Sequence, residues 1–293
     1  MPQAERPLYL PFLRYPGVVH MGLEKLDLQE WIQPDHDFNR YYQNKLRVYQ
    51  QIPERVSISL PSAQAAAVEL AARLLAHLTT DHADRYTLRD AGQMLQLEPE
   101  QLQWPVSAQP NLQDVALWVQ DDLCLLQEVA GQYVLTAASL CAPSNWDLRE
   151  KIGKPISEIH APVPGLNKAI GKQIDHVLNK LSPLRPFQRF NWSIKDIDAL
   201  TLLPGEAGSA AGQAGSESLF LRVERQTLTR LPTSGAIAFT IRVYITPLAQ
   251  LASIEGALEA LRAAVHAMSA QEGMYKDLVP LFPVLQQFFK RII

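Results

Sequence analysis

The sequence predicts an α+β protein in which helices pack on an antiparallel sheet, and three observations support this class. Apolar runs at 123–127 and 133–138 flank Ala130-Gly131, a pattern typical of an antiparallel hairpin. Residues 236–246 alternate apolar and other side chains over a long stretch, which indicates a central strand. Segments of helical periodicity precede and follow this β-rich middle, so we expect helices to cover the sheet.

Composition limits the class of protein further. The chain has 293 residues, of which 47% are hydrophobic, so it can bury a large core. A net charge of -3 gives no basic surface of the kind that nucleic-acid-binding proteins need. The sequence shows no signal peptide and no apolar run of ~18 residues, so we expect a cytoplasmic protein without a membrane span. Cys124 and Cys141 lie in apolar runs and are expected to be buried, inert thiols.

The first third of the chain predicts an arm followed by helices. Residues 1–20 hold three aromatic residues among four prolines, which favours an extended arm that packs across a domain surface. Helices are expected at 27–51 and at 62–79, where Ser62 is the expected N-cap. Residues 81–104 are expected to form a turn-rich connector into the β-rich region.

The remaining elements follow from alternation or from helical spacing. Two further strands are expected at 187–194 and 219–226, and further helices at 114–120, 146–150, 167–181, 254–268 and 278–293. Residues 204–217 are a low-complexity stretch and are expected to form a flexible loop.

Three regions are expected within one folded unit. Residues 1–110 would be an arm and a helical region that packs on the core, and residues 111–250 would be the sheet core. Residues 251–293 would add C-terminal helices to the same unit.

The segment from Leu140 to Ile194 concentrates prolines, two tryptophans and two histidines, His160 and His176, between ordinary elements. Proline fixes φ and removes a backbone donor, so this segment predicts a rigid, irregular path. His160 lies within it in Ile-His-Ala-Pro-Val-Pro-Gly at 159–165. Rigid flanks of this kind would present one ring nitrogen of the histidine in a fixed direction.

Five motifs occur in order along the chain and are similar to those of one protein family. They are Pro-Ser-Asn-Trp at 143–146, Lys-Ile-Gly-Lys-Pro-Ile at 151–156, Ile-His-Ala-Pro-Val-Pro-Gly at 159–165, Arg-Phe-Asn-Trp-Ser at 189–193 and Glu-Arg-Gln-Thr-Leu-Thr-Arg-Leu-Pro at 224–232. Over roughly residues 8–250 the chain resembles the haem-dependent oxidative N-demethylase α subunit, that is, the dimethylamine monooxygenase-like proteins. It departs from the family at Ala142, where a larger residue is expected, and in the longer 204–217 loop, which leaves open whether the substrate is dimethylamine or something larger.

The resemblance implies a PAS-like antiparallel sheet, with flanking N- and C-terminal helices, that binds haem b. It also implies a monooxygenase that oxidises a small secondary methylamine, such as dimethylamine, to a primary amine and formaldehyde. Electrons would come from a separate flavin and iron–sulfur reductase, because the chain contains no Gly-rich dinucleotide fingerprint and no four-cysteine cluster. The partners implied are the amine, dioxygen and this reductase. The stretch 275–293 would either dock the reductase or be ordinary core helix.

Under this resemblance His160 is the haem-iron ligand, because neutral imidazole is a standard axial ligand. Glu158 is close in sequence, but a strand-like path would point it in the opposite direction. His176, on the following helix, is the rival ligand. The other histidines are expected to be solvated or structural, and they are His20, His36, His77, His82 and His266.

Three arginines in the motifs, Arg189, Arg225 and Arg230, are expected to bind the haem propionates, since guanidinium matches a carboxylate with two parallel bonds. The alternative is that they form salt bridges to Glu224 and its neighbours, or solvate the sheet. Alternation places Arg225 on a half-buried strand face, where a cation would need an anionic partner.

Further pocket residues follow from the same motifs. Lys151 and Lys154 are candidates for the propionates, although loop lysines are more often solvated. Trp146 and Trp192 are expected in the apolar wall of the haem pocket, which is itself core.

Polar residues on the motif strands are the candidate catalytic groups. Glu224, Gln226, Asn191 and Ser193 would orient dioxygen and the amine in the pocket. Because an amine substrate arrives as a cation, we expect one buried carboxylate to recognise it. Glu224 is the residue that we expect to supply this carboxylate.

Two other functions stay open on the sequence alone. PAS-like sheets more commonly sense than catalyse, so a non-catalytic haem-binding sensor or carrier is the first alternative. The chain has no attached output module, which counts against signalling. A binding protein that keeps the scaffold without the cofactor is the second.

Overall fold

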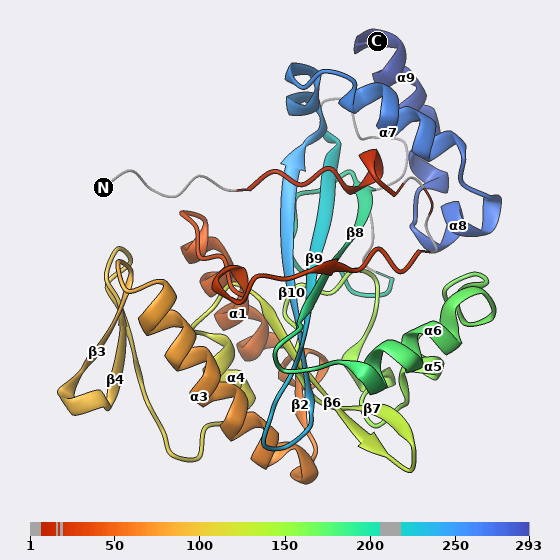
Figure 1. Ribbon diagram of the computed structural model, residues 1–293. Coiled ribbons are helices and arrows are strands. Elements are labelled where there is room, and N and C mark those ends of the chain that lie inside the picture. The colour runs from red at the N-terminus through yellow and green to blue at the C-terminus, as the bar shows by residue number, and fades with distance from the viewer. Residues whose placement is uncertain (1–6, 16, 18–19, 206–217, 293) are drawn as a thin grey trace.

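The computed structural model describes residues 7–15, 17, 20–205 and 218–292. Its main element is a seven-stranded antiparallel sheet with the strand order β1-β8-β9-β10-β6-β7-β2 (Figure 1). The strands of this sheet are β1 (Glu24–Lys25), β2 (Ser57–Ser59), β6 (Asp122–Val129), β7 (Gln132–Ser139), β8 (Phe187–Lys195), β9 (Phe220–Arg230) and β10 (Ile237–Pro247). Together with the helices, this sheet confirms the predicted α+β class.

Helices lie on both faces of the main sheet. They are α1 (Phe38–Gln51), α2 (Pro53–Val56), α3 (Gln64–Asp81), α4 (Leu112–Ala116), α5 (Ile156–Ile159), α6 (Leu166–Lys180), α7 (Ala257–His266), α8 (Ala270–Tyr275) and α9 (Phe282–Ile292). In Figure 1, α5, α6 and α8 lie to the right of the strands and α7 and α9 at the upper right, while α3 and α4 lie at the lower left.

The predicted hairpin and central strand are both confirmed. Strands β6 and β7 pair in antiparallel fashion around Ala130-Gly131, where both residues adopt positive φ values of 51° and 81°. Strand β10 lies in the middle of the sheet between β9 and β6. The alternation of its side chains therefore assigns each residue to one of two buried faces, as expected for a strand covered on both sides.

The turn-rich connector predicted at 81–104 is instead a small antiparallel sheet of β3 (Tyr86–Arg89), β4 (Met94–Leu97) and β5 (Leu102–Pro105). Each strand has four residues, which is too short for alternation to stand out in the sequence. The β3–β4 turn places Asp90, Ala91 and Gly92 at positive φ, and the β4–β5 turn places Gln101 there. Asp90 and Gly92 are usual turn residues, whereas Gln101 gives no turn signal.

Other predicted elements differ at their boundaries. Within 27–51, the α-helix begins only at Phe38, and residues 28–30 form a short 3-10 turn. Ser62 belongs to the 3-10 turn before α3 and is not its N-cap, because α3 begins at Gln64. Most of the loop predicted at 204–217, namely 206–217, lies outside the described residues.

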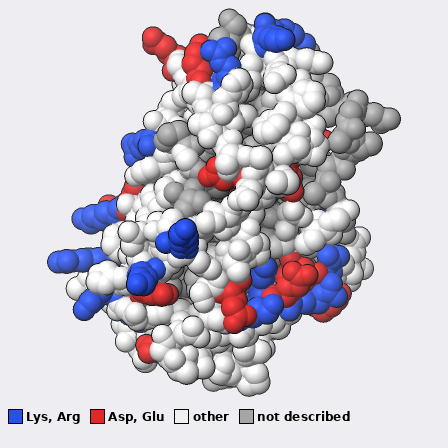
Figure 2. All heavy atoms as spheres, turned by 90° about the vertical axis from the view of Figure 1, so that its right-hand side faces the viewer, with Lys and Arg blue, Asp and Glu red and all other residues white. Residues whose placement is uncertain are grey.

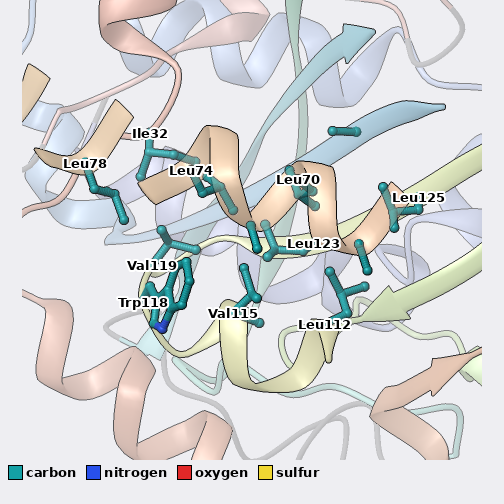
Figure 3. Close-up of a cluster of buried hydrophobic side chains, with 14 of the residues drawn as sticks. Ile32, Leu70, Leu74, Leu78, Leu112, Val115, Trp118, Val119, Leu123 and Leu125 are labelled. Atoms are coloured by element: carbon teal, nitrogen blue, oxygen red, sulfur yellow. The ribbon is translucent and has the colours of Figure 1, made fainter. Parts of the chain in front are cut away.

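Two apolar cores occupy the two ends of one sheet face. The first lies between α3, α4 and β6 (Figure 3). Labelled side chains of this core are Leu70, Leu74 and Leu78 of α3, Leu112 and Val115 of α4, and Leu123 and Leu125 of β6. In the second core α7 and α9 pack on Trp192, Val223 and Tyr244.

The C-terminal stretch and the N-terminal arm both belong to the second core. Phe288 and Phe289 of α9 are buried there, which favours core helix over docking surface for this stretch. Phe12 of the arm packs edge-on against Trp192 with ring centroids 5.6 Å apart. The described part of the arm therefore crosses the sheet surface, as predicted.

A buried polar seam separates the two cores. Arg242 of β10 pairs with Asp35 at 2.9 Å, and both side chains are at most 2% exposed. Lys45 of α1 is also buried, and its Nζ donates to the carbonyl oxygens of Ala116, Val119 and Asp121. The seam fixes the N-terminal helical region to the sheet through groups that must keep their partners.

Both cysteines are free and buried, as predicted. Burial raises the pKa of Cys141 to about 12, so its thiol stays protonated near neutral pH. Among the described residues, the structure contains no helix that is long and apolar enough to cross a membrane.

Asp147 connects the loop at 144–151 to helix α2, and its loss should lower stability. Its carboxylate accepts hydrogen bonds from Arg149 and from Arg55 of α2, which lower its pKa to about 2. We expect Asp147→Asn to lower the free energy of unfolding by about 1 to 2 kcal/mol at pH 7. The stabilisation from a depressed carboxyl pKa is complete above the unfolded value of 3.8 and is lost as the pH falls towards the folded value of about 2. The difference in unfolding free energy between wild type and variant should therefore shrink over this range. Urea titrations at pH 7 and pH 3 measure this, and an equal loss at both would contradict it.

Candidate functional site

The sheet face opposite the two cores forms the floor of a cavity of about 590 Å³. Strands β6 to β10 supply the floor, α5 and α6 supply the opposite wall, and the loop at 144–151 and the end of α8 complete the lining. Most lining side chains are apolar, and they include Leu126, Leu135, Ile159, Ile174, Leu228 and Ile241. A cavity of this volume and character suits a cofactor or another small molecule.

His160 lines this cavity from the C-terminal end of α5. Its backbone N–H bonds Ile156 in a helical turn, so the strand-like path expected around Glu158 is wrong, and Glu158 is exposed. Burial, with smaller contributions from Arg189 and Lys151, lowers the pKa of His160 to about 4. The imidazole is therefore neutral at pH 7 and offers a lone pair.

The two ring nitrogens of His160 have no hydrogen-bond partner among the described residues, and Nδ1 is fully buried. The rival His176 lies on the exposed side of α6 and does not line the cavity. Of the two predicted candidates, only His160 has access to this space.

A polar strip crosses the cavity floor on β8 and β9. Asn191 lies directly opposite Glu224, and Arg189 lies opposite Gln226. All four side chains are therefore neighbours on one face of the sheet, and all four line the cavity. Gln226 Nε2 donates to Glu224 Oε2 at 3.0 Å, and Asn191 Nδ2 donates to the same oxygen at 3.4 Å. Two neutral amides thus hold one carboxylate oxygen of Glu224, and the other oxygen has no hydrogen bond from a described residue.

A second polar group closes the cavity where the C-terminal region meets β8. Lys276 Nζ donates to Asn191 Oδ1 at 3.0 Å and to the carbonyl oxygen of Trp192. Lys195 Nζ pairs with Asp277 at 2.9 Å, and Asn145 Nδ2 bonds the same carboxylate at 3.1 Å. The strip and this group make one end of the cavity polar.

Arg189 carries a positive charge into the cavity, and no carboxylate of a described residue bonds it directly. Its Nη2 donates to the carbonyl oxygen of His20 at 3.3 Å, and its Nε is buried without a partner. Burial lowers the pKa of Arg189, while Glu224 and Tyr275 oppose that shift. An anionic group of a bound molecule would satisfy this guanidinium.

Four residues predicted to bind the cofactor lie outside the cavity lining. Arg225 faces the seam and donates to Gln188 Oε1 and to the carbonyl oxygens of Trp31 and Glu30, so it is partnered by neutral oxygens and not by an anion. Trp192 lies on the same face in the second core.

Arg230 and Lys154 are also placed elsewhere. The guanidinium of Arg230 bonds the carbonyl oxygens of Leu178, Leu181 and Gly235 and thereby fixes the end of α6. Lys154 is exposed just before α5. Arg230, Lys154, Arg225 and Trp192 therefore do not contact the cavity in which a cofactor would lie.

Several cavity residues were missed by sequence reasoning. Lys195 continues the alternation of Arg189, Asn191 and Ser193, so the strand pattern contained a signal for it. Lys276 and its neighbours reach the cavity from a helix more than 80 residues downstream, and no local pattern predicts that approach.

The outer surface on this side gives no single-sign field. Figure 2 views the side of the molecule on which α6 and α8 lie, and Lys or Arg and Asp or Glu side chains are both spread over it. This face therefore offers no single-sign patch that would attract a charged partner.

Comparison with known families gives a match over most of the chain. The model of a family described as "Haem-dependent oxidative N-demethylase, alpha subunit-like" matches residues 22–285. The match covers nearly the whole chain and includes all five motifs, so it confirms the family resemblance seen in the sequence. The description gives the family an oxidative demethylase role that depends on haem.

Proposed function

The chain belongs to the haem-dependent oxidative N-demethylase, alpha subunit-like family, and from this premise we propose that its cavity binds haem b and demethylates a small secondary methylamine. Dimethylamine is the simplest such substrate, and the products would be a primary amine and formaldehyde. The observation that carries the proposal is the neutral, unpartnered imidazole of His160 on the wall of a largely apolar cavity.

The residues that line the cavity fit haem in three respects. A volume of about 590 Å³ lies in the range of cofactor sites. His160 would hold the haem iron, because its neutral ring already offers a lone pair. Arg189 and Lys151, whose charges both act on His160, would receive the two propionates in place of Arg225, Arg230 and Lys154. The sheet would then serve as a PAS-like haem platform.

Bound haem would supply dioxygen activation, and the chain's own residues would bind and orient the amine. Glu224 would hold the substrate ammonium with its free carboxylate oxygen, because Gln226 and Asn191 fix the other oxygen. The apolar walls would exclude water from the methyl group, which needs no polar partner. Asn191 and Gln226 would thus act by positioning Glu224 as well as by lining the site.

Removal of the Glu224 charge should weaken recognition of the amine. We expect Glu224→Gln to lower kcat/KM for dimethylamine by about 10- to 100-fold, mainly through KM, since a charge-assisted hydrogen bond is lost. Glu224→Asp, which keeps the charge, should lose less. Formaldehyde release against amine concentration, normalised to haem content, measures this, and an unchanged KM in Glu224→Gln would remove Glu224 from substrate recognition.

Electrons would come from a partner. The words "alpha subunit" in the family description support an enzyme with further components, and we propose a separate flavin and iron–sulfur reductase as one of them. Added reductase, or a chemical reductant in its place, is therefore part of any activity assay.

An optical spectrum followed by a turnover assay tests the proposal. Haem-reconstituted protein should show a Soret band and, with dimethylamine, oxygen and an electron source, should release formaldehyde. A Soret band without formaldehyde release would favour a non-catalytic haem sensor or carrier. A protein that stays colourless after reconstitution would leave a scaffold without the cofactor and refute the haem assignment.

A further inference from the structure

Three buried lysines of this chain have different partners, and the differences separate their chemistry. Lys45 donates to three backbone carbonyl oxygens in the seam, away from the cavity. Lys195 lines the cavity but pairs with the carboxylate of Asp277 at 2.9 Å. Lys276 lines the same cavity, and both of its acceptors, Asn191 Oδ1 and the Trp192 carbonyl, are neutral.

The two acceptors of Lys276 suit a neutral amine. An ammonium has three N–H donors, whereas a neutral amine has two and keeps a lone pair. No described residue accepts a third hydrogen bond from Lys276, and the remaining neighbour recorded for its Nζ is the Trp192 ring, whose centroid lies 5.4 Å away. Two N–H groups can therefore be satisfied while the third position of the nitrogen has no hydrogen-bond acceptor. The side chain is only 5% exposed and lines the cavity, so that position is screened from bulk water.

The charges around Lys276 make the neutral form accessible. Burial lowers its pKa to about 8, Arg189 and Lys195 act in the same direction, and Glu224 and Glu272 oppose them. A lysine that is desolvated and lies beside other cations is a recognised arrangement for an amine that attacks carbonyl groups.

We propose that Lys276 is a carbonyl-capturing amine that binds small aldehydes in this cavity through a reversible imine. The Nζ lone pair would attack the carbonyl carbon to form a C–N bond, and a proton would move from nitrogen to the carbonyl oxygen. Loss of that oxygen as water would then leave the imine, so amine plus aldehyde gives imine plus water without any oxidation or reduction. The link to formaldehyde as the physiological aldehyde rests on the proposed function, whereas the capture site does not.

Competitive labelling of the wild-type protein tests the site without turnover. Purified protein is treated at pH 8 with limiting formaldehyde and cyanoborohydride, which reduces the imine to an N-methyl group, and each lysine is quantified by peptide mass spectrometry. We expect Lys276 to be methylated roughly tenfold or more faster than the surface lysines, because far more of it is neutral at this pH than of a solvated lysine with the reference pKa of about 10.4. Lys195 should also react more slowly, because its ammonium group is held by the Asp277 carboxylate. Lys195 is a matched internal control, since it lines the same cavity but is paired with a carboxylate.

Two further measurements separate the possible outcomes. Lys276→Arg keeps the positive charge but cannot form the imine, so the fast methylation should disappear while the slow labelling of other lysines continues. Labelling of Lys276 no faster than that of surface lysines would overturn the proposal, whether or not the protein binds haem. Fast labelling of Lys276 in a protein that binds no haem would support the capture site and count against the proposed function alone.

Discussion

His160→Ala is expected to fold but to bind haem at least about 100-fold more weakly than the wild type. Loss of a group that only supports a metal ligand lowers metal affinity by about 10- to 100-fold, so loss of the ligand itself should cost at least the upper value. The imidazole makes no side-chain hydrogen bond to a described residue, so its removal should disturb the scaffold little. Haem titration followed at the Soret band gives the affinity, and the far-UV circular dichroism spectrum checks the fold.

The matched control for this prediction is His176→Ala. His176 lies on the exposed side of α6, the helix that forms a wall of the same cavity. Its replacement should leave haem affinity and the Soret maximum unchanged. Full haem content with an unaltered Soret band in His160→Ala would exclude this residue as the ligand, and loss of haem in His176→Ala would point to a different arrangement of α6.

The parts of the fold that the sequence predicts are those with long, regular patterns. Alternation over 236–246 identified β10, and the Gly-containing turn identified the β6–β7 hairpin. The small sheet of β3, β4 and β5 was missed because four-residue strands show only two residues on each face, which is too few for alternation to be recognised.

The candidate site was predictable to the same extent. Alternation on β8 and β9 groups Asn191, Glu224 and Gln226 on one face, and the structure places all three in the cavity. Alternation also separates Arg225 from them, but the sequence does not show which face carries the cavity. Backbone carbonyl oxygens from distant loops satisfy Arg225, and such partners leave no local signal.

Arg242→Met, which removes one partner of the buried ion pair in the seam on the opposite face, is expected to be strongly destabilising. The variant leaves the Asp35 carboxylate buried without its cation, which should lower the free energy of unfolding by about 3 to 5 kcal/mol. In the wild type, burial acts to raise the pKa of Asp35, but Arg242 and Gln120 outweigh it and bring that pKa below its usual value. Without Arg242 the pKa should rise, so the deficit should be largest near pH 7 and shrink as acid protonates the carboxyl group.

A second substitution separates the charge from the packing of this pair. In Arg242→Met combined with Asp35→Asn no buried charge is left alone, and Gln120, which bonds the Asp35 side chain at 2.7 Å, can still bond the amide. The double variant should therefore be more stable than Arg242→Met alone, as urea unfolding of both at pH 7 would show. Arg242 faces away from the cavity, whereas Ile241 beside it lines the cavity. Haem affinity of the folded double variant should thus equal that of the wild type, and a parallel loss of haem would mean that the seam and the cavity are not independent.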